Sequence, residues 1–175
     1  MSNLYEEKFR RFLAEHRVQA EVLSFQQSCH SVAEAAQAAN AAPDDFIKSI
    51  CMVDQQGNLV VAIVKGEDRV SLSQVAQALN IPTPRLATAE EMLERTGYPC
   101  GGTPPFGFAA TFLIDPKVLE KETVYAGGGS ENVLLRISPQ EIRRVNGGRV
   151  VRVRKKSHTW GVSCRGKPLI TGDRG

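Results

Sequence analysis

Residues 97–107, Gly-Tyr-Pro-Cys-Gly-Gly-Thr-Pro-Pro-Phe-Gly, restrict the possible fold more than any other part of the sequence. They include four glycines and three prolines in eleven positions, so neither a helix nor a strand interior can accommodate them. Glycine permits positive φ and close approach to the main chain, whereas proline fixes φ. The segment is therefore predicted to be a rigid loop that presents backbone N–H groups. Such groups bind a phosphate, a carboxylate or a developing oxyanion, but a purely structural turn between two sheet elements explains the composition equally well.

Apolar periodicity and helix-capping signals predict the rest of the architecture. Helices are predicted at 3–17, after Ser31, after Ser71, at 88–95 and after Ser138. Strands are predicted at 18–25, 46–53, 59–64, 111–115, 123–126, 132–137 and 149–153, and the second and third of these form a β-hairpin. Mixed strands and helices in irregular alternation indicate an α+β fold rather than a doubly wound sheet.

Length and composition indicate an ordinary globular chain. Its 175 residues are 42% hydrophobic and 23% charged, which suits one domain. No apolar run approaches the ~20 residues that span a bilayer, and the N-terminus lacks the basic and apolar regions of a signal peptide, so a cytoplasmic location is expected. The four cysteines form no C-x-x-C pair, which argues against a zinc site and against disulfides. Neither a P-loop nor Gly-x-Gly-x-x-Gly occurs, so an ATP-dependent step is not expected.

Positive charge is concentrated at the C-terminal end. Residues 1–142 carry 12 Lys/Arg and 18 Asp/Glu, a balance of −6, whereas residues 143–175 carry 10 Lys/Arg and one acidic residue, a balance of +9. A basic segment of this kind is typical of phosphate contacts with nucleic acid. The residues predicted to contact nucleic acid are Arg152, Arg154, Lys155 and Lys156. A solvated extension without a ligand is the alternative interpretation.

The pattern Gly-Gly-x-x-Pro-x-Gly at 101–107, preceded by Thr-Gly-Tyr at 96–98, resembles the signature loop of the YbaK-like family. This family comprises the editing insertion domain of bacterial prolyl-tRNA synthetases and its free-standing relatives. The resemblance also includes Val-Ala-Glu-Ala-Ala at 32–36, Phe-Ile-Lys-Ser at 46–49, Lys-Gly-Glu-Asp-Arg at 65–69 and Tyr-Ala-Gly-Gly-Gly-Ser at 125–130. It follows the family's order from about residue 4 to residue 153, which implies a domain of residues 1–153 and a basic C-terminal extension of residues 154–175.

The resemblance implies a fold and an activity. The implied fold is a mixed, partly barrel-like β-sheet flanked by helices. The implied activity is trans-editing, in which the ester of a mischarged tRNA is hydrolysed to release a small amino acid such as alanine or cysteine from tRNA-Pro or a similar tRNA. The implied partners are aminoacyl-tRNA and, in addition, an aminoacyl-tRNA synthetase, whereas no metal, cofactor, membrane or DNA is implied.

The resemblance also implies which residues form the site. The family's essential lysine falls at Lys48, and an ammonium group within an apolar strand must reach solvent, pair with an anion or face a cavity. Backbone N–H groups around Gly101 and Gly102 would bind the oxyanion or the amino-acid moiety. The remaining predicted substrate-binding residues are Phe46, Val64, Pro105, Phe106, Gly107, Gly127, Gly128, Gly129 and Ser130.

The substrate's own 2′-hydroxyl assists the attacking water in this family, so no protein base is nominated. A further polar residue varies within the family, and Ser130, Asn132 and Glu141 are the candidates.

Two other functions remain open at this point. Cys100 lies beside the glycine pair and would serve as the nucleophile of a cysteine hydrolase, with His30 or His158 as the base. Alternatively, the glycine segments and the basic end would bind a tRNA end or a nucleotide without catalysis. Assays with mischarged tRNAs separate these three interpretations.

Overall fold

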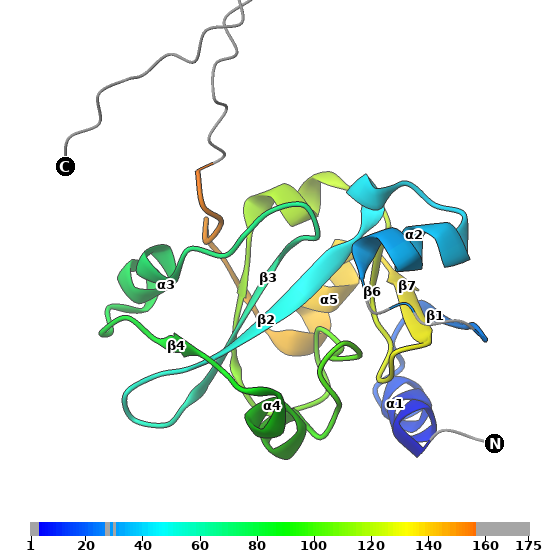
Figure 1. The fold of residues 1–175 in the computed structure, drawn as a ribbon, viewed down its shortest axis with the longest axis horizontal. Helices are drawn as coiled ribbons and strands as arrows, with labels where there is room; N and C mark the ends of the chain where they lie inside the picture. Colours follow the sequence, from blue (N-terminus) through cyan, green and yellow to red (C-terminus); the bar gives the residue numbers. More distant parts are fainter. Residues whose placement is uncertain (1–3, 27–28, 30, 157–175) are drawn as a thin grey trace, which may run out of the picture.

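The computed structural model describes residues 4–26, 29 and 31–156, and this part of the chain has the predicted α+β fold (Figure 1). Its helices are α1 (Leu4–Glu15), α2 (Val32–Ala39), α3 (Leu72–Leu79), α4 (Ala89–Thr96) and α5 (Pro139–Asn146), with 3₁₀ turns η1 (Pro43–Asp45) and η2 (Pro116–Glu120). Its strands are β1 (Ala20–Ser24), β2 (Ile47–Val53), β3 (Leu59–Lys65), β4 (Arg85–Leu86), β5 (Thr111–Ile114), β6 (Val124–Gly127), β7 (Val133–Ile137) and β8 (Arg149–Val150). None of the described helices combines the length and hydropathy needed to cross a membrane.

The strands form two sheets that adjoin. The larger sheet has the order β4-β2-β3-β5-β8, in which β2 pairs antiparallel with both β3 and β4 while β5 pairs parallel with β3 and β8. The smaller sheet, β1-β7-β6, is antiparallel. A parallel bridge between Phe46 and Tyr125 joins the start of β2 to β6. The two sheets therefore meet at this bridge, as the predicted mixed, partly barrel-like arrangement requires.

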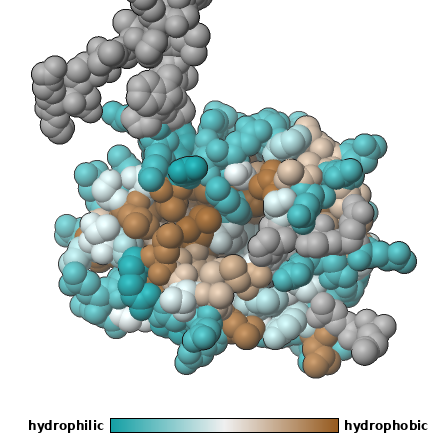
Figure 2. All heavy atoms as spheres, in the orientation of Figure 1, coloured by the Kyte–Doolittle hydropathy of each residue, from teal (hydrophilic) through white to brown (hydrophobic). Residues whose placement is uncertain are grey.

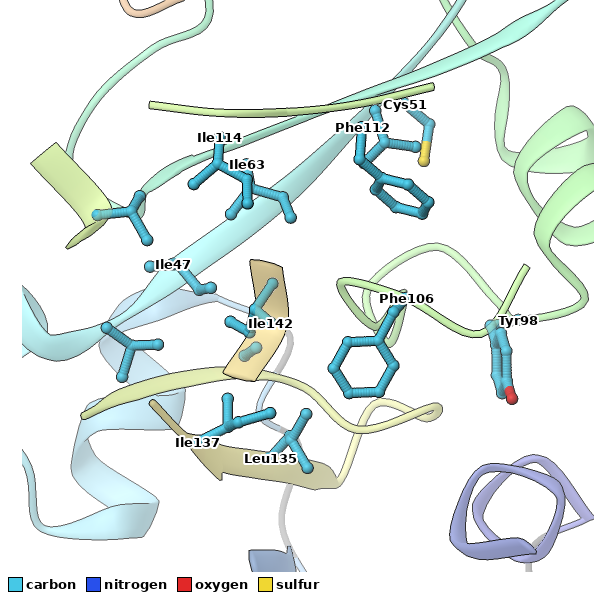
Figure 3. Close-up of a cluster of buried hydrophobic side chains, with 14 of the residues drawn as sticks. Ile47, Cys51, Ile63, Tyr98, Phe106, Phe112, Ile114, Leu135, Ile137 and Ile142 are labelled. Atoms are coloured by element: carbon cyan, nitrogen blue, oxygen red, sulfur yellow. The ribbon is translucent and has the colours of Figure 1, made fainter. Parts of the chain in front are cut away.

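Apolar side chains pack on both faces of the larger sheet. The first core lies between the two sheets and includes Ile47, Ile63, Phe106 and Leu135 (Figure 3). The second core lies on the opposite face and includes Met52, Val64 and the α3 residue Val75. Because β3 contributes to both cores, all seven of its residues are buried.

The predicted N-caps explain where four of the helices begin. The side-chain oxygens of Ser31, Ser71, Thr88 and Ser138 each accept a hydrogen bond from the backbone N–H three residues later. Thr88 and Glu91 form a complete capping box, which satisfies two of the N–H groups that a helix start leaves without partners. These local bonds fix the start of α4, which follows directly on β4.

Two features of the larger sheet differ from the prediction. The sequence does not predict strand β4, because the strand is only two residues long, follows a Pro-Thr-Pro segment and exposes both side chains. Strand β8 ends at Val150 rather than at residue 153. Beyond it, the buried carboxylate of Asp115 accepts hydrogen bonds from the N–H groups of Val153 and Arg154, at 3.0 and 3.2 Å. The Asp115 side chain thus bonds to this backbone beyond the end of the strand, where an isolated antiparallel bridge also joins Arg154 to Val70.

Candidate functional site

A cavity of about 360 Å³ opens beside β2. It is lined by residues 46–51 of β2 and its start, by α2, by the glycine-rich loop 97–107 and by β6. Figure 2 shows hydrophobic residues gathered over the part of the surface where β2 and β4 lie. A mainly apolar hollow with a few polar groups is typical of a binding site for a small ligand.

The two glycine segments lie directly against each other at this cavity. A Cβ atom added to Gly102 would come within 2.5–2.7 Å of the Ser130 backbone, and one added to Gly127 would lie 2.4 Å from the carbonyl oxygen of Thr103. The N–H of Gly129 donates to the carbonyl of Gly102 at 2.8 Å. Only glycine permits this backbone-to-backbone contact, which brings the loop 97–107 and the segment 127–130 together.

The two glycines nominated as oxyanion donors differ in their surroundings. Gly101 lines the cavity and has φ +90°, a value that favours glycine. Gly102 is buried, and its N–H already donates to the carbonyl of Pro99 at 3.0 Å. The N–H of Gly102 is therefore committed to the loop itself, and the structure assigns Gly102 to loop packing rather than to the cavity wall.

Lys48 lies on β2 and lines the cavity. Burial lowers the pKa of its ammonium group from the ordinary 10.5, the charge of Arg69 lowers it further, and Asp68 acts in the opposite direction. No residue in the described part of the chain forms a hydrogen bond or ion pair with this ammonium group. By contrast, the buried Lys65 is paired with Asp44. Lys48 is thus a partly desolvated cation that can receive an anionic ligand.

Among the other predicted substrate contacts, Phe46 and Gly127 line the cavity. Phe46 is buried, and its ring stacks on that of Tyr125 with centroids 4.9 Å apart. Gly128 packs against Val133, and Gly129, with φ +105°, packs against Tyr5 and Phe9. These two glycines shape the segment behind the cavity.

Four predicted pocket residues lie elsewhere. Val64 belongs to the second core, and Phe106 stacks on Phe9 in the first core, with ring centroids 5.7 Å apart. Pro105 is buried, and its carbonyl accepts a hydrogen bond from Asn146. Gly107 faces Phe12 and Tyr98.

The apolar wall of the cavity comes instead from residues that the sequence did not indicate, namely Ile47, Ile50, Ala87, Met92 and Leu134.

The three candidates for the variable polar residue form hydrogen bonds or ion pairs within the protein. The hydroxyl of Ser130 donates to Asn132, and the amide of Asn132 donates to the carbonyl of Phe25 at 2.8 Å. Glu141 lies on α5, where it pairs with Arg144 and accepts a hydrogen bond from the Gln19 N–H. None of these three side chains lines the cavity.

Three cysteines line the cavity: Cys29, Cys51 and Cys100. Burial raises the pKa of Cys29, and it raises the pKa of Cys51 to about 12. Both groups are therefore thiols near neutral pH, and only the thiolate is a strong nucleophile. Cys100 is the exposed one of the three. The nominated bases His30 and His158 lie outside the described residues.

Of the four predicted tRNA-binding residues, one is held in an ion pair within the protein and three are exposed. Arg154 forms an ion pair of 2.6 Å with Asp115, whose carboxylate is 1% exposed. Arg152, Lys155 and Lys156 are exposed. The N–H of Lys155 donates to the carbonyl of Arg69 at 2.7 Å, so contacts with the domain extend past the predicted boundary between residues 153 and 154. Residues 157–175 lie outside the described part.

Arg154→Ala is expected to lower the free energy of unfolding by about 2 kcal/mol, because the buried carboxylate of Asp115 loses a charged hydrogen-bond donor. Urea denaturation of this variant measures the effect, with the exposed Arg152→Ala as the matched control. Equal denaturation midpoints for the two variants would show that the ion pair does not support the fold.

Comparisons with known proteins identify the fold and the family of this chain. A candidate trans-editing enzyme for prolyl tRNA synthetase has a crystal structure that superimposes with a TM-score of 0.80 at 27% identity, covering 89% of this chain and 100% of the other. The crystal structure of hypothetical protein APE2540 superimposes with a TM-score of 0.79 at 30% identity, covering 85% of this chain and 99% of the other.

Sequence comparison gives the same relationship. The uncharacterized protein YwhH of Bacillus subtilis (strain 168) is 24% identical over 124 residues, which are 70% of this chain and 78% of YwhH. The aminoacyl-tRNA editing domain matches residues 26–145, a range that includes β2, the loop 97–107 and the segment 127–130. The chain therefore belongs to the aminoacyl-tRNA editing domain family.

Proposed function

We propose that this protein is a trans-editing aminoacyl-tRNA deacylase. It hydrolyses the ester of a mischarged tRNA that carries a small amino acid such as alanine or cysteine, on tRNA-Pro or a similar tRNA. One observation carries the proposal: in a member of an editing family, a single cavity combines the unpaired cation of Lys48 with backbone from both glycine segments. The expected place of action is the cytoplasm, with the protein acting alone or bound to a synthetase.

The cavity supplies what ester hydrolysis needs. The ammonium group of Lys48 binds the terminal phosphate or the ribose, because a cation without a protein partner attracts an anion in a partly desolvated site. The backbone N–H of Gly101 stabilises the negative charge that develops on the ester carbonyl, and one such donor changes the rate by roughly 10²–10³-fold. Water is the nucleophile, and the substrate's 2′-hydroxyl assists it.

The apolar wall limits the size of the amino acid. Ile47, Ala87 and Met92 line the cavity, and one methylene group more or less in such a pocket is worth about 1–3 kcal/mol. Discrimination between alanine and cysteine therefore depends on small changes in this wall.

Deacylation assays with alanyl-, cysteinyl- and prolyl-tRNA test the proposed function. We expect rapid release of one small amino acid and slow release of proline from its cognate tRNA. Tight binding of every tRNA without release of amino acid would favour the non-catalytic binding module. Release that stops when Cys100 is alkylated, with an acyl group trapped on its sulfur, would favour the cysteine hydrolase.

Cys100→Ser and Cys51→Ser are expected to retain most of the deacylase activity, because water and not a thiolate attacks the ester. The kcat/KM for the preferred aminoacyl-tRNA measures this. A drop of about 10³-fold in the Cys100 variant alone would overturn the proposed mechanism, since a nucleophile cannot be replaced without an effect of this size.

Neutralising the exposed basic residues is expected to weaken tRNA binding. Arg152→Gln, Lys155→Gln and Lys156→Gln together leave the ion pair of Arg154 intact. KM should rise and kcat should change little, because these residues contribute uniform binding. The log–log dependence of binding on salt should flatten by about 0.7–0.9 for each tRNA phosphate that the variant no longer neutralises. An unchanged salt slope would leave tRNA recognition to other surfaces.

A further inference from the structure

One edge of β2 faces the cavity. Six consecutive residues, 46–51, line it. Because side chains of a strand point alternately to its two faces, the side chains on one face cannot explain an unbroken run of six. The cavity must border the edge of the strand, where backbone N–H and C=O groups emerge.

The hydrogen-bond register shows which backbone groups emerge there. The N–H of Gly66 donates to the carbonyl of Phe46 at 2.7 Å, and the N–H of Asp54 donates to the carbonyl of Asn58 at 3.0 Å. These bonds mark hydrogen-bonded pairs at both ends of the β2–β3 ladder, and such pairs alternate along an antiparallel ladder. Ser49, opposite Ile63, is therefore a non-hydrogen-bonded position, and its N–H and C=O point away from β3.

The sheets leave this edge open at Ser49. Figure 1 shows β4 beside one end of β2 and β6 beside the other. At the first end, the N–H of Ala87 donates to the carbonyl of Cys51 at 2.9 Å. At the second end, Phe46 forms the bridge with Tyr125. Ser49 lies between these two contacts and is paired with neither β4 nor β6.

We propose that the backbone of Ser49 pairs with the aminoacyl group of the substrate as one strand residue pairs with another. The α-ammonium group donates to the Ser49 carbonyl, and the ester carbonyl accepts from the Ser49 N–H. An aminoacyl ester carries its amino and carbonyl groups with the spacing of one residue in a strand, and an open strand edge pairs with such groups. This inference rests on the proposed function, and it adds that the Ser49 backbone recognises the free α-amine of the substrate.

The pairing also orients the amino-acid side chain and the reacting carbonyl. Paired residues place their side chains on the same face, so the substrate's side chain lies on the face of Ile47 and Cys51, beside Ala87 and Met92. The Ser49 N–H reaches the ester carbonyl and becomes a second donor to the oxyanion, together with Gly101. The pairing thus couples recognition of the α-amine to hydrolysis.

A proline substitution tests the protein side of this pairing. Ser49→Pro removes an N–H that β3 does not use, which a strand tolerates at an edge. Ser49→Ala removes the same hydroxyl and keeps the N–H, so it is the matched reference. We expect kcat/KM of Ser49→Pro to be at least about tenfold below that of Ser49→Ala, since one oxyanion donor is removed. Equal values in two folded variants would overturn the pairing.

Substrate analogues test the pairing in the wild-type protein and without turnover. Calorimetry measures the affinity for 3′-alanylamino-3′-deoxyadenosine, whose amide resists hydrolysis. Two counterparts lack the free amine: in one it is N-acetylated, and in the other, the lactoyl compound, a hydroxyl group replaces it. We expect the free amine to bind at least about tenfold more tightly than either, because it donates a charged hydrogen bond. Equal affinities, or no binding of any analogue, would overturn the inference. Discrimination between analogues by a protein that releases no amino acid from any tRNA would support the pairing and contradict the proposed deacylase function alone.

Discussion

Lys48→Ala is expected to lower kcat/KM for deacylation by about 10²–10³-fold, the effect of removing one charge-stabilising group from a partly desolvated site. The fold should remain intact, because no described residue bonds to the Lys48 ammonium group and the substitution removes a cation that is costly to bury. Steady-state kinetics and urea denaturation of the same preparation separate the two effects.

Two variants serve as controls for Lys48→Ala. Lys48→Arg should also be damaging, since a planar guanidinium does not replace a compact ammonium group. Lys121 is paired with Asp44 and Asp45 and does not line the cavity, so Lys121→Ala should turn over substrate at the wild-type rate. Near wild-type turnover by Lys48→Ala would remove Lys48 from the site.

The lowered pKa of Lys48 gives this expectation a pH dependence. Because its pKa lies below the ordinary 10.5, Lys48 loses its proton at a lower pH than a lysine side chain in water does. The contact between Lys48 and the phosphate or ribose of the substrate then weakens as the pH rises through that lowered pKa. KM should therefore increase at alkaline pH. In Lys48→Ala this alkaline increase should be absent, because no ammonium group titrates there.

Local signals in the sequence are sufficient for most of the fold. The caps Ser31, Ser71, Thr88 and Ser138 each form the expected bond, because an N-cap depends only on residues within one turn. The hairpin of β2 and β3 is equally local. Strand β4 escapes prediction because its pairing with β2 depends on residues more than thirty positions away.

The site is harder to predict because it depends on which face a residue occupies. Every residue of β3 is buried, so its sequence has no polar alternation to show that Val64 faces the second core and not the cavity. Phe106 follows two prolines in a loop, yet it stacks on Phe9 of α1. Arg154 belongs to a basic cluster in the sequence, but its partner Asp115 is 39 residues away. The open edge at Ser49 follows from the hydrogen-bond register of β2, so the residue types in the sequence do not predict it.

Gly102→Ala is expected to lower the free energy of unfolding by about 3 kcal/mol and to abolish most of the activity. The added Cβ would lie 2.5 Å from Cα and 2.6 Å from N of Ser130. Both are backbone atoms, which cannot rotate away as a flexible side chain can, so the loop 97–107 must separate from the segment 127–130. Overpacking of a close-packed contact costs up to about 3 kcal/mol, and the separation displaces Gly101 and Gly127, which line the cavity.

Gly57→Ala is the matched control for this substitution. Gly57 also lies in a loop, with φ +83°, but a Cβ there meets no atom within 4 Å. Its substitution therefore carries only the backbone strain of a left-handed residue, about 1–2 kcal/mol, and should leave kcat/KM at the wild-type value. Urea denaturation and deacylation assays of the two variants side by side separate strain from steric displacement. Full activity of Gly102→Ala would mean that the two glycine segments can move apart without changing the site, and that their contact supports the fold but not catalysis.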